Sequence, residues 1–147
     1  GREGPVVLHL AGERDFESLR PRVQRPDYHL LPSLDDFGAA LSAVDLALSR
    51  SGGTVWELAA AGLPAVLVPY PHATADHQTK NARYFERGGG AVVVPESELA
   101  RAPELAESLL GDEARLDAMS AAMRALARED AAERIAEELI ELATARG

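Results

Sequence analysis

Residues 49–82 read SRSGGTVWELAAAGLPAVLVPYPHATADHQTKNA, and the fold can be worked outward from this stretch. It predicts a polar turn with two adjacent glycines, followed by a helix over about residues 54–61 that Gly62 and Pro64 end. A short apolar strand over residues 65–68 comes next. A loop containing proline and histidine then leads to a second helix that begins near His77, with Asp76 as its N-cap.

The turn and the helix after it are typical of a phosphate site. Gly52 and Gly53 let the backbone turn freely and leave N–H groups pointing outward at the positive end of a helix dipole. Glu57 lies one turn into the helix, where its carboxylate can accept hydrogen bonds from sugar hydroxyls of the same ligand. The alternative is a capping box, in which Thr54 caps the helix and Glu57 reaches back to it without any ligand.

The second half of the stretch favours a ligand. A strand that ends in Pro69-Tyr70-Pro71-His72 is followed by a polar loop and by Asp76-His77-Gln78-Thr79-Lys80-Asn81. These hydrogen-bonding side chains fall at the carboxyl edge of a parallel sheet, where open α/β folds bind ligands.

The remaining chain predicts an α/β fold with a Rossmann-like parallel sheet and flanking helices. Further strands are expected over residues 5–10, where the strand is read as buried, and over 28–31, 44–48 and 91–94. Ser33 and Asp36 fit a capping box before a short helix. From residue 96 onward the pattern is helical only. Its apolar stripes, expected to face the core, comprise Leu105 with Leu109, then Leu116, Met119, Met123 and Leu126, then Ile135, Leu139 and Leu142. The acidic positions Glu133, Glu137, Glu138 and Glu141 predict a solvated face.

Composition narrows the function classes. A chain of 147 residues predicts one domain, residues 1–147. Its net charge of -9 argues against nucleic-acid binding, and the absence of cysteine excludes disulfides and thiolate metal sites. No apolar run is long enough to span a membrane, so we expect a cytoplasmic protein. We also expect no metal and no cofactor. The fingerprints GxGxxG, GxxxxGK, HExxH and GxSxG are all lacking.

Three segments together carry a family resemblance. Residues 49–64 (SRSGGTVWELAAAGLP), 68–72 (VPYPH) and 76–82 (DHQTKNA) resemble the C-terminal domain of the MurG family. These glycosyltransferases add GlcNAc from UDP-GlcNAc to lipid I to make lipid II in peptidoglycan synthesis. The resemblance extends over essentially the whole chain. It implies the donor-binding half of a two-domain GT-B enzyme, one that is peripheral on the cytoplasmic face of the cell membrane.

The resemblance assigns UDP-GlcNAc contacts by position. Leu34 should present its backbone to the uracil, Glu57 should hold the ribose hydroxyls, and Gln78 with Asn81 should read the GlcNAc hydroxyls. His77 is expected to assist them, and His72 should shape the sugar site. The backbone around the diphosphate is expected to come from Ser51, Gly52, Gly53, Thr54 and Val55. The SRSGG turn is one residue shorter than in many family members, which shifts these backbone contacts by one position.

The same resemblance predicts what this chain lacks. The family's domain opens with a central strand and a glycine-rich loop, and neither is found before residues 5–10, which resemble its second strand. The acceptor site for lipid I and the general base belong to the family's N-terminal domain, so no catalytic residue is expected in this chain. We therefore predict an inactive fragment that binds donor weakly at most. Two alternatives are a non-catalytic donor-binding subunit of a split transferase and an α/β module that self-associates through its incomplete sheet.

Overall fold

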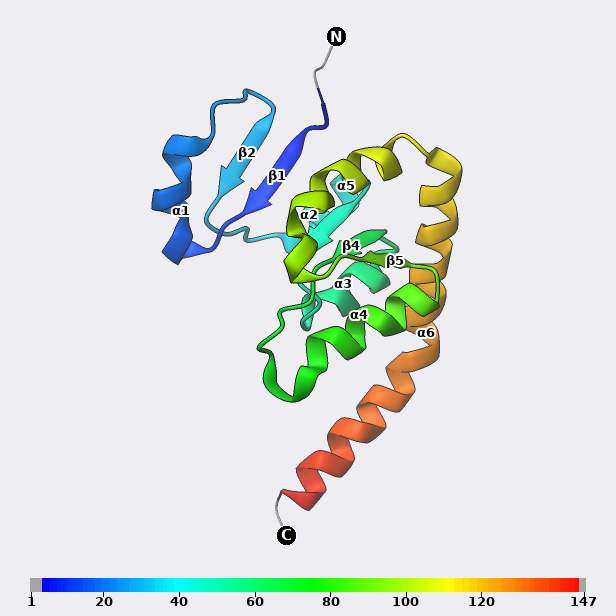
Figure 1. The fold of residues 1–147 in the computed structure, drawn as a ribbon. Helices are drawn as coiled ribbons and strands as arrows, with labels where there is room; N and C mark the ends of the chain where they lie inside the picture. The colour runs from blue at the N-terminus through cyan, green and yellow to red at the C-terminus, as the bar shows by residue number, and fades with distance from the viewer. Residues whose placement is uncertain (1–3, 146–147) are drawn as a thin grey trace. The chain divides into compact units, whose positions relative to one another are not determined.

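The computed structural model describes residues 4–145, apart from the side chains at positions 129–132, 134, 135, 138 and 142. Strands and helices alternate up to β5, and helices follow it (Figure 1). The chain forms two compact units that divide between Ala40 and Leu41. All strand pairs are parallel, which confirms the predicted class of sheet.

The first unit is one βαβ arrangement. Strand β1 (Val7–Leu10) pairs with β2 (Tyr28–Leu31), and α1 (Glu13–Leu19) with the 3-10 turn η1 (Arg20–Arg22) connects them. Pro21 follows the end of α1, because its ring prevents the α-helix from continuing. No described residue of this unit is buried, and Leu8 and Leu10 are each 37% exposed. The prediction of a buried strand over residues 5–10 is therefore wrong, because alternate residues of β1 are exposed to solvent.

The second unit holds a three-stranded sheet in the order β3-β4-β5. It is built from β3 (Ala47–Ser49), β4 (Ala65–Leu67) and β5 (Ala91–Val93), joined by α3 (Thr54–Ala60) and by η2 (Thr74–Asp76) with α4 (His77–Arg87). The crossover helices match the predicted positions. Strand β3 starts at Ala47, three residues later than predicted, and β1 and β3 belong to separate sheets.

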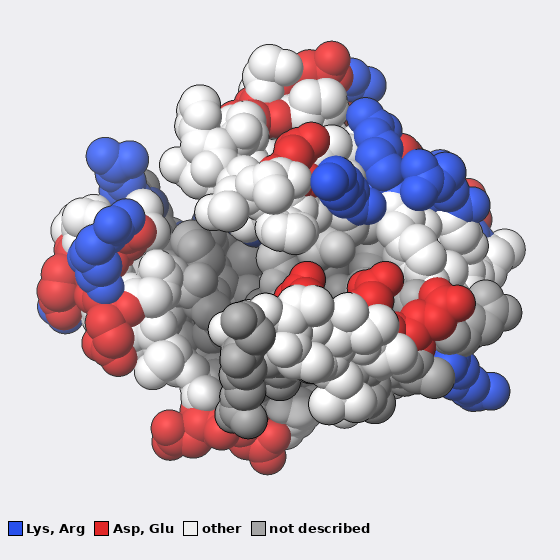
Figure 2. Space-filling view, turned by 90° about the horizontal axis from the view of Figure 1, so that it is seen from below, with Lys and Arg blue, Asp and Glu red and all other residues white. Residues whose placement is uncertain are grey.

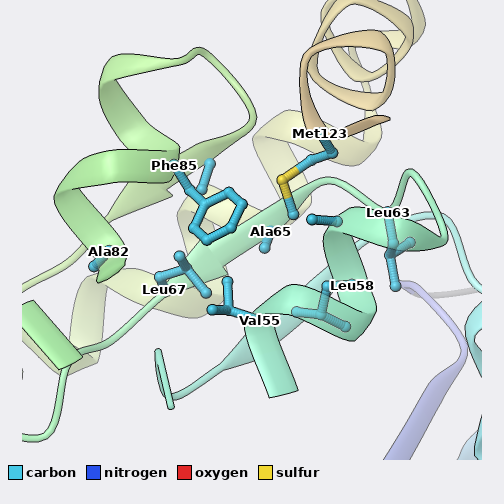
Figure 3. Close-up of a cluster of buried hydrophobic side chains, with 10 residues drawn as sticks. Val55, Leu58, Leu63, Ala65, Leu67, Ala82, Phe85 and Met123 are labelled. Carbon is cyan, nitrogen blue, oxygen red and sulfur yellow. The ribbon is translucent and has the colours of Figure 1, made fainter. Parts of the chain in front are cut away.

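The core surrounds β4, because this strand has a neighbour on each edge and helices on each face. Ala65 and Leu67 point toward α3 and α4, where Figure 3 shows Phe85 and Met123 directed at the same strand. Val66 and Val68 point to the opposite face and pack with Leu109 of α5 (Ala102–Leu110). Alternation along one strand therefore fills two hydrophobic clusters.

The long helix α6 (Glu113–Thr144) closes the second unit. Met123 joins the α3–α4 cluster and Met119 joins the α5 cluster, so α6 passes the edge of the sheet and contacts both faces. Glycine allows this approach, since a Cβ at Gly90 would lie 2.6 Å from the Met123 sulfur. Gly62, with a φ of 67°, turns the chain out of α3, and its carbonyl accepts a 2.6 Å bond from the Ser120 hydroxyl.

Several predictions about helix ends and stripes need correction. Asp36, and not Ser33, caps α2 (Phe37–Ala43), because its carboxylate accepts the Ala39 N–H at 2.8 Å. Leu139 is 61% exposed, so the stripe near the end of α6 does not face a core in this structure. Ile135, Leu142 and Glu138 lie outside the described side chains, while Glu133, Glu137 and Glu141 are exposed as predicted.

Candidate functional site

The carboxyl ends of β3, β4 and β5 meet at one edge of the sheet. The turn at residues 50–53 leaves β3, the loop at residues 68–76 leaves β4, and Glu96 follows β5 at the start of η3 (Glu96–Arg101). The first turns of α4 begin where the β4 loop ends. Because parallel strands present their carboxyl ends together, the sequence segments predicted to bind a ligand converge here.

Ser51 fixes the glycine turn to α4. Its side chain is fully buried, and its hydroxyl donates to the Gln78 carbonyl at 2.6 Å. Its own carbonyl accepts a 3.0 Å bond from Asn81 Nδ2. A buried polar group that finds partners in this way costs little and specifies one arrangement. Ser51 therefore fixes the glycine turn to α4, and its hydroxyl is used in a hydrogen bond inside the protein.

The orientations of the two site amides follow from their backbone partners. The Tyr70 N–H can only donate, so the Gln78 atom 2.9 Å from it is Oε1. The Ser51 carbonyl can only accept, so the Asn81 atom that contacts it is Nδ2. Gln78 is left with its Nε2 donors, and Asn81 is left with its Oδ1 acceptor. The site thus offers one neutral donor and one neutral acceptor, three residues apart on the same helix face.

The glycine turn lies beside the Gln78 donor. A Cβ at Gly52 would lie 3.6 Å from Gln78 Nε2, while one at Gly53 would have nothing within 4 Å. Among the described residues, the N–H groups of Gly53 and Thr54 donate to no backbone carbonyl, whereas Val55 N–H bonds to the Gly52 carbonyl at 3.1 Å. The turn therefore keeps two adjacent N–H groups available for an anion next to the Gln78 amide.

The capping box of Thr54 and Glu57, which is the alternative to a ligand, is not formed. The N-cap of α3 is Gly53, one residue before Thr54, and no side chain caps this helix end. Glu57 is exposed within the first turn of α3. The carboxylate is therefore not used in the way that the alternative without a ligand requires.

The structure gathers ten of the eleven predicted contact residues in the second unit. Val55 is buried and points into the core (Figure 3), so only its backbone can face the site. His72 in the loop after β4 and His77 at the start of α4 are exposed. Leu34 belongs to the first unit, between β2 and α2, and is half-buried there. The individual ligand contacts stay predictions.

One pair at this edge was missed by sequence reasoning. Arg50 reaches across the end of β4 to Glu96, with a second contact of 3.1 Å from Nη2 to Oε1. Its Nη1 also donates to the Val68 carbonyl at 3.3 Å, and its guanidinium lies 5.6 Å from the Tyr70 ring centre. The hydrogen bond from Arg50 lowers the pKa of Glu96, and the same bond raises the pKa of Arg50. The only available signal was the position of Glu96, directly after a strand.

The surroundings of the site limit the kinds of ligand that it can bind. The described residues include no cluster of three or more His, Asp and Glu side chains that could hold a metal. Figure 2 shows basic and acidic side chains on the same face of a chain whose net charge is -9. Within residues 4–145, no helix is both long enough and apolar enough to cross a membrane. The arrangement suits a small ligand with an anionic part and hydroxyl groups.

Comparisons with known proteins identify the family of this chain. The family model "Glycosyltransferase family 28 C-terminal domain" matches residues 4–139. UDP-N-acetylglucosamine--N-acetylmuramyl-(pentapeptide) pyrophosphoryl-undecaprenol N-acetylglucosamine transferase of Methylococcus capsulatus is 43% identical over 99% of this chain and 42% of its own length. The enzyme of the same name from Alkalilimnicola ehrlichii is 45% identical over 90% of the chain and 38% of its own length. The chain thus spans about two fifths of these relatives.

A solved structure extends the match to three dimensions. The crystal structure of Acinetobacter baumannii MurG superposes with a TM-score of 0.61 and 27% identity, over 88% of this chain and 39% of that one. The resemblance to the MurG family and the Rossmann-like sheet expected from it are both confirmed. The chain belongs to the glycosyltransferase family 28 C-terminal domain family.

Proposed function

We propose that this domain binds UDP-GlcNAc and supplies the donor side of an inverting glycosyltransferase. In the proposed reaction, GlcNAc passes to lipid I to give lipid II in peptidoglycan synthesis. The observation that carries the proposal is the pair of fixed amides, Gln78 and Asn81, held beside two available backbone N–H groups at the carboxyl edge of the sheet. That combination matches the chemical groups of a nucleotide sugar.

Each group of the site has a counterpart in the donor. The N–H groups of Gly53 and Thr54 suit diphosphate oxygens, because backbone donors at a turn before a helix bind anions. The Gln78 donor and the Asn81 acceptor suit sugar hydroxyls, which both give and accept hydrogen bonds. The Glu57 carboxylate suits the two ribose hydroxyls.

The relatives support the same substrates. The name of the Methylococcus and Alkalilimnicola enzymes includes UDP-N-acetylglucosamine, which we take as the donor, and a pyrophosphoryl-undecaprenol, which we take as the acceptor. Because the acceptor carries a polyprenyl lipid, we propose that the whole enzyme works at the cytoplasmic face of the membrane.

In the proposed transfer, a lipid I hydroxyl oxygen attacks the anomeric carbon of GlcNAc. A new C–O bond forms while the bond to the diphosphate breaks, UDP leaves with the bonding electrons, and the hydroxyl proton passes to a base that the resemblance places in the family's N-terminal domain. The domain assists by holding the diphosphate and the sugar in fixed positions, which converts part of the reaction's entropy cost into binding. We assign no catalytic base among the described residues.

The direct test is a titration of isotope-labelled chain with UDP-GlcNAc, followed by amide NMR. We expect saturable shifts at Gly53, Thr54, Gln78 and Asn81. The Glu57→Gln variant should bind about tenfold more weakly or worse, because hydrogen bonds to a charged group contribute about 1.5–3 kcal/mol.

The matched control is Glu104→Gln, which changes an exposed carboxylate on α5 that is not among the proposed contacts. It should leave affinity unchanged. A well-dispersed spectrum without ligand shifts would contradict the proposed donor binding by this chain. Equal losses in both variants would contradict the role of Glu57.

A further inference from the structure

We infer that Arg50 and Glu96 form a positioning pair that holds the loop after β4 in the shape the sugar end of the donor requires. The pair lies in the second unit and joins the turn after β3 to the segment after β5. Neither residue is among the contacts proposed above. The inference rests on the proposed donor function and deepens it.

The first step of the argument is what Arg50 contacts. One guanidinium group binds the Glu96 carboxylate through both of its terminal nitrogens, donates to the Val68 carbonyl and covers the Tyr70 ring. Arginine can combine these contacts because its donors are planar and its face stacks on aromatic rings. Val68 and Tyr70 flank Pro69, so Arg50 contacts the loop on both sides of Pro69, where the loop leaves β4.

The second step follows the contacts from Tyr70 into the site. Its backbone N–H holds Gln78 Oε1 at 2.9 Å, and this bond aims the Gln78 donor. Its ring packs edge-to-face on His72, with centres 5.6 Å apart. A shift of Tyr70 would therefore move one proposed sugar contact and the histidine beside it together. The chain of contacts runs from Glu96 through Arg50 and Tyr70 to Gln78 and His72.

The third step is the strain in the remainder of the loop. Ala75 and Asp76 have φ values of 51° and 58°, a left-handed backbone conformation that residues other than glycine rarely adopt. Two such residues in succession persist only where the surrounding structure holds the loop in that shape. Arg50 holds the start of the loop through Val68 and Tyr70, and α4 holds its end.

The test compares Glu96→Gln with Glu98→Gln in the 147-residue chain. Glu98 is the matched control, because it lies in the same 3-10 segment and also pairs with an arginine, but its partner Arg101 is not a site residue. Binding of UDP-GlcNAc and of UDP is measured for each variant by amide NMR. Amide exchange at Tyr70 is measured without ligand.

We expect Glu96→Gln to weaken UDP-GlcNAc binding by about three- to fivefold, the range that one partly exposed ion pair supplies, and to leave UDP binding within about twofold. Tyr70 amide exchange should become faster. Glu98→Gln should change none of these. Arg50→Lys keeps the charge but not the planar contacts, so it should resemble Glu96→Gln, and the double variant should be no worse than either single one.

The outcomes separate this inference from the proposed function. Equal losses for UDP and UDP-GlcNAc, or no loss for either, would overturn the positioning role while the wild type still binds donor. A wild type that binds neither ligand would overturn the proposed function of this chain. In that case amide exchange at Tyr70 still tests the positioning pair. An exchange rate that Glu96→Gln leaves unchanged would overturn it.

Discussion

Residues 4–40 and residues 41–145 use the same βαβ arrangement, yet only the second region encloses a core. Strand β1, with the sequence VLHL, alternates between partly buried and exposed residues, whereas β4, with the sequence AVL, is buried throughout. Both strands are mainly apolar, although β1 includes His9. The difference lies in their positions, because β4 has strands on both edges and helices on both faces. An apolar run therefore becomes a buried strand only when the topology supplies its cover.

The largest expected effect comes from an aromatic residue in each region. Phe85→Ala should lower the free energy of unfolding by about 3–5 kcal/mol, because Phe85 is fully buried in the α3–α4 cluster. Phe16→Ala in the first region should cost much less, because Phe16 is only half-buried. Denaturant unfolding can be followed by Trp56, the only tryptophan, whose ring lies 4.8 Å from that of Phe85. Similar losses for the two variants would contradict the contrast.

Replacement of glycine by alanine is expected to destabilise the second region at one position and to stabilise the first region at another. Gly90→Ala should destabilise the protein by about 1–3 kcal/mol, because the new Cβ meets Met123 in a packed region. Gly38→Ala should stabilise α2 by up to about 1 kcal/mol, since its nearest neighbour beyond the helix is an ordinary 3.6 Å contact. Thermal unfolding by circular dichroism measures both. Destabilisation by Gly38→Ala would show that the first region is packed more tightly than its exposure indicates.

A glutamine in each region allows the same comparison for the affinity of UDP-GlcNAc. Gln78→Glu keeps an oxygen for the Tyr70 N–H but replaces the Nε2 donor by a second carboxylate oxygen, so UDP-GlcNAc affinity should fall about tenfold or more. Gln24→Glu changes an exposed glutamine of the first region by the same charge and should have no effect. Calorimetric titration distinguishes them. Equal losses would point to net charge and would remove the donor role of Gln78.

The smallest expected effect is electrostatic. Because the Arg50 hydrogen bond lowers the pKa of Glu96 in the folded chain, the stabilisation by this pair is present above the pKa of an unfolded glutamate. It is lost as the pH falls through the lower pKa of the folded state. A carbon-detected NMR titration of the Glu96 carboxyl should give a pKa below the ordinary glutamate value, and Arg50→Ala should restore it. An ordinary value in the wild type would contradict the pair.

Local pattern was sufficient for most of the second region. The glycines, prolines and apolar runs of residues 49–94 fixed two strands and two helices, because each signal agrees with its neighbours. The roles of Ser51 and Glu96 could not be predicted in this way. Ser51 is defined by partners 27 and 30 residues away, and Glu96 by a partner 46 residues away. Such pairings depend on how strands are ordered in space, which periodicity does not report.

The same limit explains the errors. Residues 5–10 have the composition of a buried strand, but their exposure depends on neighbours that the composition does not specify. Ser33 and Asp36 were both suitable caps, and the start of the helix at Phe37 selected Asp36. Leu139 continues the helical spacing of the apolar stripe, yet spacing alone does not supply a surface for it to pack against.

The contact between α6 and the turn at Gly62 has a consequence for how the protein is made. Ser120 lies 58 residues after its partner Gly62, and Met123 lies 58 residues after Ala65. A growing chain on the ribosome therefore leaves β4 incompletely covered until α6 has been synthesised. The pairing of β1 with β2 needs only 21 residues of separation and can form much earlier. The pair of β1 and β2 can therefore form before the three-stranded sheet of the second unit has its full cover.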